Sequence, residues 1–150
     1  MAHPTFTDDE LVSRAEKNNF QTSHDLREIS ILCSSHGSIE GLKNLKNKGL
    51  SFGMNEVIEA CANGHVNVLI FLVKNGVTPS TTIEKGDFSY PTYPETYIPS
   101  NAYKIGADIA CRNKHMNVLN WLFSTFKILP TPYEASAAGY LEWFLQCEER

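Results

Sequence analysis

Cysteine and histidine are the residue types with which this chain could do chemistry. It contains four cysteines and five histidines in 150 residues. Thiolates and imidazoles bind zinc, and pairs of cysteines form disulfides. No Cys-x-x-Cys pair occurs among Cys33, Cys61, Cys111 and Cys147. The spacing gives no support to a zinc site, so the surrounding residues must decide between a metal, disulfides and a buried structural role.

Catalytic signatures are missing from the sequence. It has no Ser-His-Asp order, no His-Glu-x-x-His pair and no glycine-rich phosphate loop. Asp8, Asp9 and Glu10 form an acidic cluster. Acidic side chains are favoured at the start of a helix, so this cluster has a structural explanation. We therefore predict that the protein is not an enzyme and takes no cofactor and no metal.

Two of the cysteines belong to a repeated segment. Residues 60–72 read Ala-Cys-Ala-Asn-Gly-His-Val-Asn-Val-Leu-Ile-Phe-Leu, and residues 110–122 read Ala-Cys-Arg-Asn-Lys-His-Met-Asn-Val-Leu-Asn-Trp-Leu. The copies are 110 − 60 = 50 residues apart, with eight positions identical and Val66 exchanged for Met116. Cys61 and Cys111 share one place, where a small buried residue is required. This favours buried structural cysteines and a reducing, intracellular compartment.

Each copy predicts a helix, a tight turn and a second helix. Small residues at 60–62 end the first helix, and Gly64 suits the left-handed conformation of the turn. Apolar residues then recur at helical spacing and predict one buried stripe: Val66, Leu69, Leu72 and Val73. Such a pair is too small to bury its apolar face alone. It therefore needs neighbours stacked on both sides.

Further copies are less complete. Setting Gly37 on Gly64, a shift of 64 − 37 = 27 residues, aligns a glycine and three apolar residues with their counterparts: Ile39, Leu42, Leu45 and Gly49. In the copy that spans residues 102–126, we expect Ile105, Ile109 and Ala110 to point inward. Lys114 and Phe126 stand where the preceding copy has Gly64 and Gly76. We therefore expect the closing turns of this copy to differ.

Both ends of the chain predict helices. Thr7 and Glu10 have the spacing of a capping box, which predicts a helix from Thr7 to about residue 18. This helix either covers one end of the stack or is a degenerate half repeat. Thr131-Pro132 predicts the start of the last pair, with proline in the first helical turn. This pair ends in the charged residues Glu148 and Glu149, as expected of a capping unit.

A long insertion separates the two best copies. Prolines at positions 79, 91, 94 and 99 exclude a helix through this segment. Two interpretations remain open: a tolerated surface loop, or a binding element. The second is favoured by the aromatic residues of the segment, which are Phe88, Tyr90, Tyr93 and Tyr97.

The pattern of small residues, a Gly-His turn and an apolar outer helix resembles the ankyrin repeat, and divergent arrays of this kind are similar to those of large DNA viruses and protists. The Thr-Pro-Leu-His opening of the family is absent, since residues 55–58 read Asn-Glu-Val-Ile. The resemblance implies an all-α, single-domain ankyrin-repeat solenoid of about four helix pairs, with capping helices and one long inserted loop. Its expected parts are a cap at 7–20, repeats at about 25–52, 53–77, 102–128 and 131–148, and the insertion at 78–101.

The resemblance also implies roles for individual residues. His65 and His115 are expected to tie backbone groups together within the turns. A partner is expected to bind the concave face, which is lined by the turns and the tips of the inner helices. The candidate binding residues are Ser35, His36, Asn63, Arg112 and Asn113, together with Phe88, Tyr90, Tyr93 and Tyr97 of the insertion.

Composition narrows the class of partner. A net charge of −4 and a pI near 5.7 argue against nucleic-acid binding. The sequence has no run of about eighteen apolar residues, so we expect no membrane span. Its polar amino terminus is unlike a signal peptide. We predict a small cytoplasmic adaptor or inhibitor that binds another protein. A location in the nucleus is also compatible with the sequence. The alternative is a self-associating assembly unit, which would be a homo-oligomer.

Overall fold

The computed structural model describes residues 6–20, 25–79 and 100–149. In these ranges the chain forms nine α-helices and no strand, which confirms the predicted all-α class. The helices are α1 (Asp8–Glu16), α2 (Leu26–His36), α3 (Ile39–Asn47), α4 (Met54–Ala62), α5 (Val66–Lys74), α6 (Ser100–Arg112), α7 (Met116–Phe126), α8 (Pro132–Ala138) and α9 (Leu141–Glu148). The aromatic residues predicted to bind from the insertion, Phe88, Tyr90, Tyr93 and Tyr97, lie outside the described residues.

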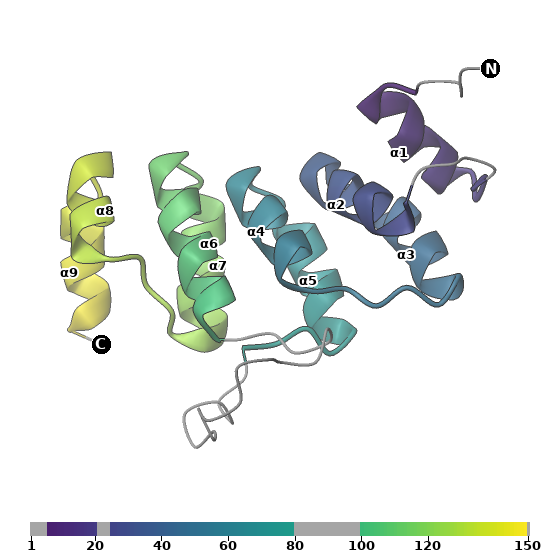
Figure 1. The fold of residues 1–150 in the computed structure, drawn as a ribbon. Helices are drawn as coiled ribbons and strands as arrows, with labels where there is room; N and C mark the ends of the chain where they lie inside the picture. The colour runs from purple at the N-terminus through teal and green to yellow at the C-terminus, as the bar shows by residue number, and fades with distance from the viewer. Residues whose placement is uncertain (1–5, 21–24, 80–99, 150) are drawn as a thin grey trace, which may run out of the picture.

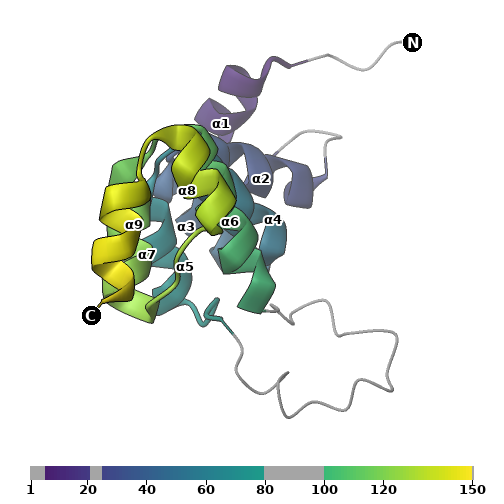
Figure 2. The same ribbon diagram turned by 90° about the vertical axis from the view of Figure 1, so that its left-hand side faces the viewer.

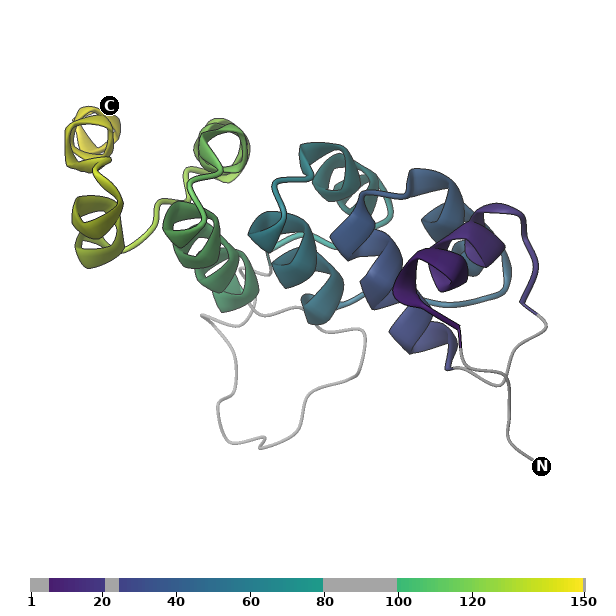
Figure 3. The same ribbon diagram turned by 90° about the horizontal axis from the view of Figure 1, so that it is seen from above.

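Consecutive helices form pairs that lie side by side in chain order (Figure 1). Seen from above, α2, α4, α6 and α8 form one row and α3, α5, α7 and α9 form the other (Figure 3). Each helix of the first row contacts the next helix of that row, and α5 contacts both α3 and α7 in the second. Helix α1 packs against α2 and α3 at one end. Every pair is thus a layer that covers its neighbour.

Local capping explains where the outermost helices begin. Thr7 Oγ1 accepts a hydrogen bond of 3.2 Å from the Glu10 amide, and Glu10 Oε1 accepts one of 3.2 Å from the Thr7 amide. This confirms the predicted capping box, and α1 ends at Glu16 rather than at residue 18. At α8, Thr131 Oγ1 accepts from the Glu134 amide at 3.3 Å, with Pro132 in the first helical turn as predicted.

The core runs along the seam between the two rows. Leucines of α3, α5 and α7 are fully buried there: Leu42, Leu45, Leu69, Leu72, Leu119 and Leu122. In α5 the third buried residue is Val68, whereas Val66 and Val73 of the predicted stripe are half-buried. Val68 precedes Leu72 by four residues and therefore shares its face of the helix.

Two expectations about α6 are wrong. The helix begins at Ser100, inside the range 78–101 assigned to the insertion, because Pro99 is the last proline of the insertion and no proline follows it before the helix ends at Arg112. Ile105 is 37% exposed instead of inward. The buried stripe contains Tyr103 and Ala107, and a residue two positions after Tyr103 lies about 200° around the helix.

Tyr103 is a core residue that the repeat pattern did not reveal. Its side chain is fully buried and packs edge-on against Phe126, with 5.3 Å between ring centroids. The phenolic hydroxyl donates to the carbonyl oxygen of Val77. The backbone before the insertion is therefore fixed to the helix that follows it.

Small residues allow the helices to approach closely. A Cβ atom added to Gly106 of α6 would lie 2.6 Å from Cys61 Sγ of α4, and one added to Gly41 of α3 would lie 2.6 Å from Cys33 Sγ of α2. Both distances are shorter than real carbon–sulfur contacts allow. All four cysteines are buried, which confirms their predicted burial.

Burial should make these thiols unreactive in the folded protein. Desolvation raises the pKa of Cys61, and that of Cys33, to about 12 from an ordinary value of 9.0. Because thiolate is the reactive form, this rise in pKa lowers the fraction of thiolate at pH 8 by about a thousandfold. We expect iodoacetamide to modify the four cysteines in urea but not in buffer, as measured by mass spectrometry. Rapid modification of Cys33 or Cys61 in buffer would contradict this packing.

Candidate functional site

The turns within the pairs contact one another across the layers. The ring of His65 covers Gly37 of the preceding turn, since a Cβ atom on Gly37 would lie 2.8 Å from His65 Nδ1. His65 Nε2 forms a hydrogen bond of 2.9 Å with the carbonyl oxygen of Ser35. His115 covers Gly64 in the same way, at 2.7 Å from the added Cβ. The imidazoles therefore hold successive turns at a fixed separation.

Asparagines add a second set of ties. Asn67 Nδ2 donates to the carbonyl oxygen of Gly37 at 3.4 Å, and Asn117 Nδ2 donates to that of Gly64 at 2.9 Å. In both copies, a histidine and the asparagine two positions after it thus contact the left-handed glycine in the turn of the preceding layer. We call the four side chains of His65, Asn67, His115 and Asn117 the turn ladder.

The expected change of turn at Lys114 is wrong. Lys114 adopts φ 63, in the same left-handed region as Gly64 at φ 77. The closing hydrogen bonds also match, with 2.8 Å from the His115 amide to the Ala110 carbonyl and 2.9 Å from the His65 amide to that of Ala60. A side chain fits at Lys114 because it is exposed, whereas a Cβ atom on Gly64 would meet the ring of His115.

The other expected difference is present at the end of the copy. Helix α7 continues to Phe126, and the left-handed residue is Lys127 at φ 58. In the preceding layer α5 ends at Lys74, and the left-handed residue is Gly76 at φ 88. Phe126 is therefore helical where Gly76 is left-handed, and it packs against Trp121 with 5.6 Å between the ring centroids.

Three of the predicted binding residues join successive layers along the turns. Asn63 Nδ2 donates to Ser35 Oγ at 3.2 Å and to the Glu59 carbonyl at 2.9 Å. Asn113 Nδ2 donates to the Ala62 carbonyl at 2.8 Å. Both amide oxygens remain acceptors at the exposed edge of the stack.

Arg112 and His36 each face a neighbouring element. Arg112 Nε lies 3.1 Å and 3.2 Å from the two carboxylate oxygens of Glu134 on α8. His36 Nε2 lies 3.1 Å from Asp9 Oδ1 on α1, and its Nδ1 lies 2.8 Å from the Leu32 carbonyl. Arg112 is exposed apart from this contact, whereas His36 is turned toward the amino-terminal helix.

Sequence reasoning missed one exposed apolar residue on this side of the molecule. Ile105, Ile109 and Arg112 follow the spacing of a single helix face. Ile105 is exposed and Ile109 is half-buried. The signal that could have revealed this face is Tyr103, because placing that large aromatic residue in the core turns Ile105 outward.

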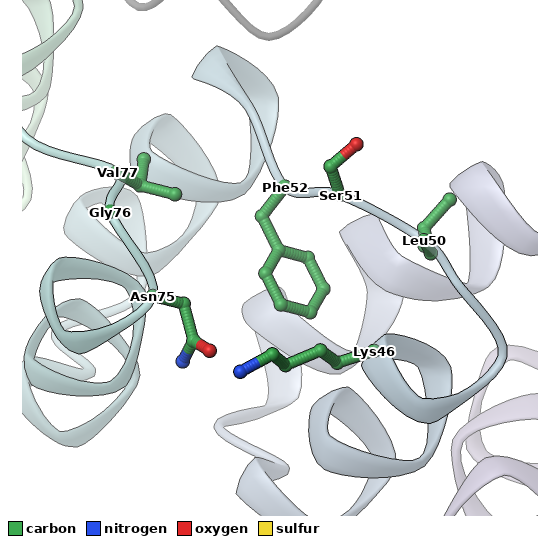
Figure 4. Close-up of a pocket in the computed structure, with 7 residues that line it drawn as sticks. All are labelled: Lys46, Leu50, Ser51, Phe52, Asn75, Gly76 and Val77. Carbon is green, nitrogen blue, oxygen red and sulfur yellow. The ribbon is translucent and has the colours of Figure 1, made fainter.

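A hollow of about 240 Å³ lies at the opposite row, between the carboxyl ends of α3 and α5. Phe52 is among its lining residues, and the side chains of Lys46 and Asn75 point toward each other beside the Phe52 ring (Figure 4). An adjoining depression is lined by Lys43, Lys46 and Lys74. Lysines in the last turn of a helix also offset the helix dipole, so their gathering here has a structural explanation.

One buried carboxylate has a structural use. Glu56 is fully buried, and its Oε1 accepts from the Gly53 amide at 2.5 Å and from Arg27 Nη1 at 3.4 Å. It therefore caps α4 and joins that helix to α2. Arg27 Nη1 also donates to the Ser51 carbonyl at 2.6 Å.

The described ranges contain no cluster of three or more His, Cys, Asp or Glu side chains able to hold a metal ion. No helix within them has both the length and the apolar content to span a membrane. Comparison with known proteins finds no matching family model, no matching curated protein and no matching solved structure.

The turn ladder predicts opposite effects of substitution at two equivalent positions. Gly64→Ala places a Cβ atom 2.7 Å from His115 Nδ1 and strains a left-handed residue. We expect it to lower the free energy of unfolding by about 1–2 kcal/mol or more. Lys114→Gly relieves the same strain with no imidazole above it, so we expect stabilisation by up to about 1 kcal/mol.

Urea unfolding followed by circular dichroism measures both effects. His115→Ala in the Gly64→Ala background should restore part of the stability, because it removes the ring that meets the new methyl group. A neutral Gly64→Ala, or equal losses at positions 64 and 114, would show that the ladder does not set the turn conformation.

Proposed function

We propose that the chain is a divergent ankyrin-type array that binds another protein. The observation that carries the proposal is the stacking of helix pairs whose turns are tied by repeated His–Gly and Asn–Gly contacts. The left-handed residues at Gly37, Gly64 and Lys114 support the same assignment. A stack held in this way loses little conformational entropy when a partner docks.

The binding surface we propose is the exposed side of the α2, α4, α6 and α8 row together with its turns. It offers amide groups at Asn63 and Asn113, a cation at Arg112 and an apolar contact at Ile105. Apolar and arginine side chains framed by polar groups are typical of the centre of a protein interface. The mode of action would be occlusion or tethering, as in a small intracellular adaptor or inhibitor.

A matched pair of substitutions tests this surface. Ile105 and Ile70 are similarly exposed, at 37% and 40%, but lie on opposite rows of the stack. The immobilised chain is used to capture proteins from a cell extract, and captured proteins are quantified by mass spectrometry. We expect Ile105→Glu to reduce capture of a specific protein at least about tenfold, because a buried charge opposes an apolar contact.

Ile70→Glu should leave that capture unchanged. Circular dichroism serves to check that both variants are folded. Equal capture by Ile105→Glu and the unaltered chain, equal loss with both variants, or no specific capture at all would contradict the proposed surface.

A further inference from the structure

The last layer matches the layer before it at a shift of 25 residues. The turn before α9 is closed by a hydrogen bond of 2.7 Å from the Tyr140 amide to the Ala135 carbonyl. The equivalent bond before α7 runs from the His115 amide to the Ala110 carbonyl at 2.8 Å. The shift is 140 − 115 = 25 and 135 − 110 = 25. It assigns an equivalent in α8–α9 to residues 107–123 of α6–α7, since 132 − 25 = 107 and 148 − 25 = 123.

Three polar residues of the α6–α7 layer hold the next layer. Asp108 Oδ1 accepts a hydrogen bond of 2.8 Å from the Thr131 amide. Arg112 pairs with Glu134, as described above. Asn120 Oδ1 accepts one of 3.0 Å from Trp143 Nε1. These side chains mark the face that each layer turns toward the layer after it.

In the last layer the same three positions lack polar side chains of this kind. The equivalents of Asp108, Arg112 and Asn120 are Tyr133, Ala137 and Leu145. Tyr133 is 79% exposed and Leu145 is 49% exposed, and no described residue covers them. Leu141, one turn before Leu145 on α9, is also exposed, at 41%. This side of α8–α9 therefore presents apolar side chains where α6–α7 presents polar ones.

Acidic residues lie near this face. Residues 131–149 contain four acidic residues and no lysine or arginine; Glu134 among them pairs with Arg112 of the preceding layer, and Arg150 lies outside the described residues. Glu148 and Glu149, the charged residues at the end of the last pair, follow Leu145 by three and four residues and share its side of α9. They therefore border the apolar residues rather than cover them. We use the name end face for Tyr133, Ala137, Leu141 and Leu145 together with these two glutamates. The helices that carry it, α8 and α9, are in front in Figure 2.

We propose that the end face docks a helix of another protein whose apolar stripe is flanked by lysine or arginine. The docked helix would lie against the side of this layer that corresponds to the side each earlier pair turns toward the next pair. Ala137 leaves room for the partner helix to approach, and the apolar side chains of Tyr133, Leu141 and Leu145 lose water on docking. This site is separate from the turns and does not depend on what binds there.

Charge decides between a basic partner and a second copy of this chain. A symmetric dimer through the end face would bring Glu148 and Glu149 against their own copies, which is unfavourable. Cationic side chains on the partner would instead pair with these glutamates and direct the approach. The chain alone should therefore remain monomeric.

Two synthetic peptides test the proposal. Both are amphipathic helices of about 18 residues with a leucine stripe, and they differ only in having lysines or glutamates beside that stripe. Fluorescence anisotropy measures their binding to the full chain. We expect the lysine peptide to bind at least about tenfold more tightly than the glutamate peptide, with an affinity that falls as salt rises.

Variants that restore the residues of the preceding layer should remove this binding. Tyr133→Asp with Leu145→Asn should weaken the lysine peptide at least about tenfold, because it replaces the apolar contacts with polar groups. The matched control is Ile70→Asn, the same kind of change at the equivalent position of α5, since 145 − 25 − 50 = 70. We expect it to bind the peptide like the unaltered chain.

Several results would overturn the proposal. Failure of the lysine peptide to bind, equal binding of the two peptides, or full binding by the Tyr133→Asp, Leu145→Asn variant would each do so. Light scattering on the chain alone gives an independent measure. A dimer that Leu145→Asn dissociates would assign the end face to a second copy instead.

Discussion

The structure depends on how closely one helix pair can approach the next. Gly106 lies against Cys61 with no room for a methyl group, and His65 and His115 lie directly on Gly37 and Gly64. Two short helices cannot bury their apolar faces alone, so this approach creates the core. The leucines of α3, α5 and α7 are fully buried because the neighbouring layers are close. Cysteine, glycine and histidine therefore serve packing here, although their types suggested chemistry.

The close approach also determines what the surface offers to other molecules. Since the turns are tied by the ladder, the amide groups of Asn63 and Asn113 are held at a fixed spacing rather than on mobile loops. Each layer turns one face toward the next and joins it through Asp108, Arg112 and Asn120 in the best-defined case. The last layer has no such polar groups. Its end face is therefore a second surface, made of apolar side chains bordered by two glutamates.

Periodicity predicted the helical class, the capping box at Thr7 and the buried cysteines, because each follows from residues close in sequence. The errors arose where a distant neighbour decides the conformation. Lys114 keeps the left-handed turn of Gly64 although it carries a side chain, and Ile105 is exposed because Tyr103 occupies the core. Of the candidate site, Ser35 and Asn63 are brought together, whereas His36 faces Asp9. Sequence alone could not show these contacts.

A double-mutant cycle at Cys61 and Gly106 tests the close approach of the layers most directly. Gly106→Ala adds a methyl group 2.6 Å from Cys61 Sγ. Although alanine favours a helix over glycine by about 1 kcal/mol, overpacking costs about 1–3 kcal/mol, so urea unfolding should show a net loss of stability. In a Cys61→Ala background the same change should be neutral or stabilising, because the methyl group fills the vacated space. Stabilisation by Gly106→Ala alone, or additive effects of the two changes, would contradict the account.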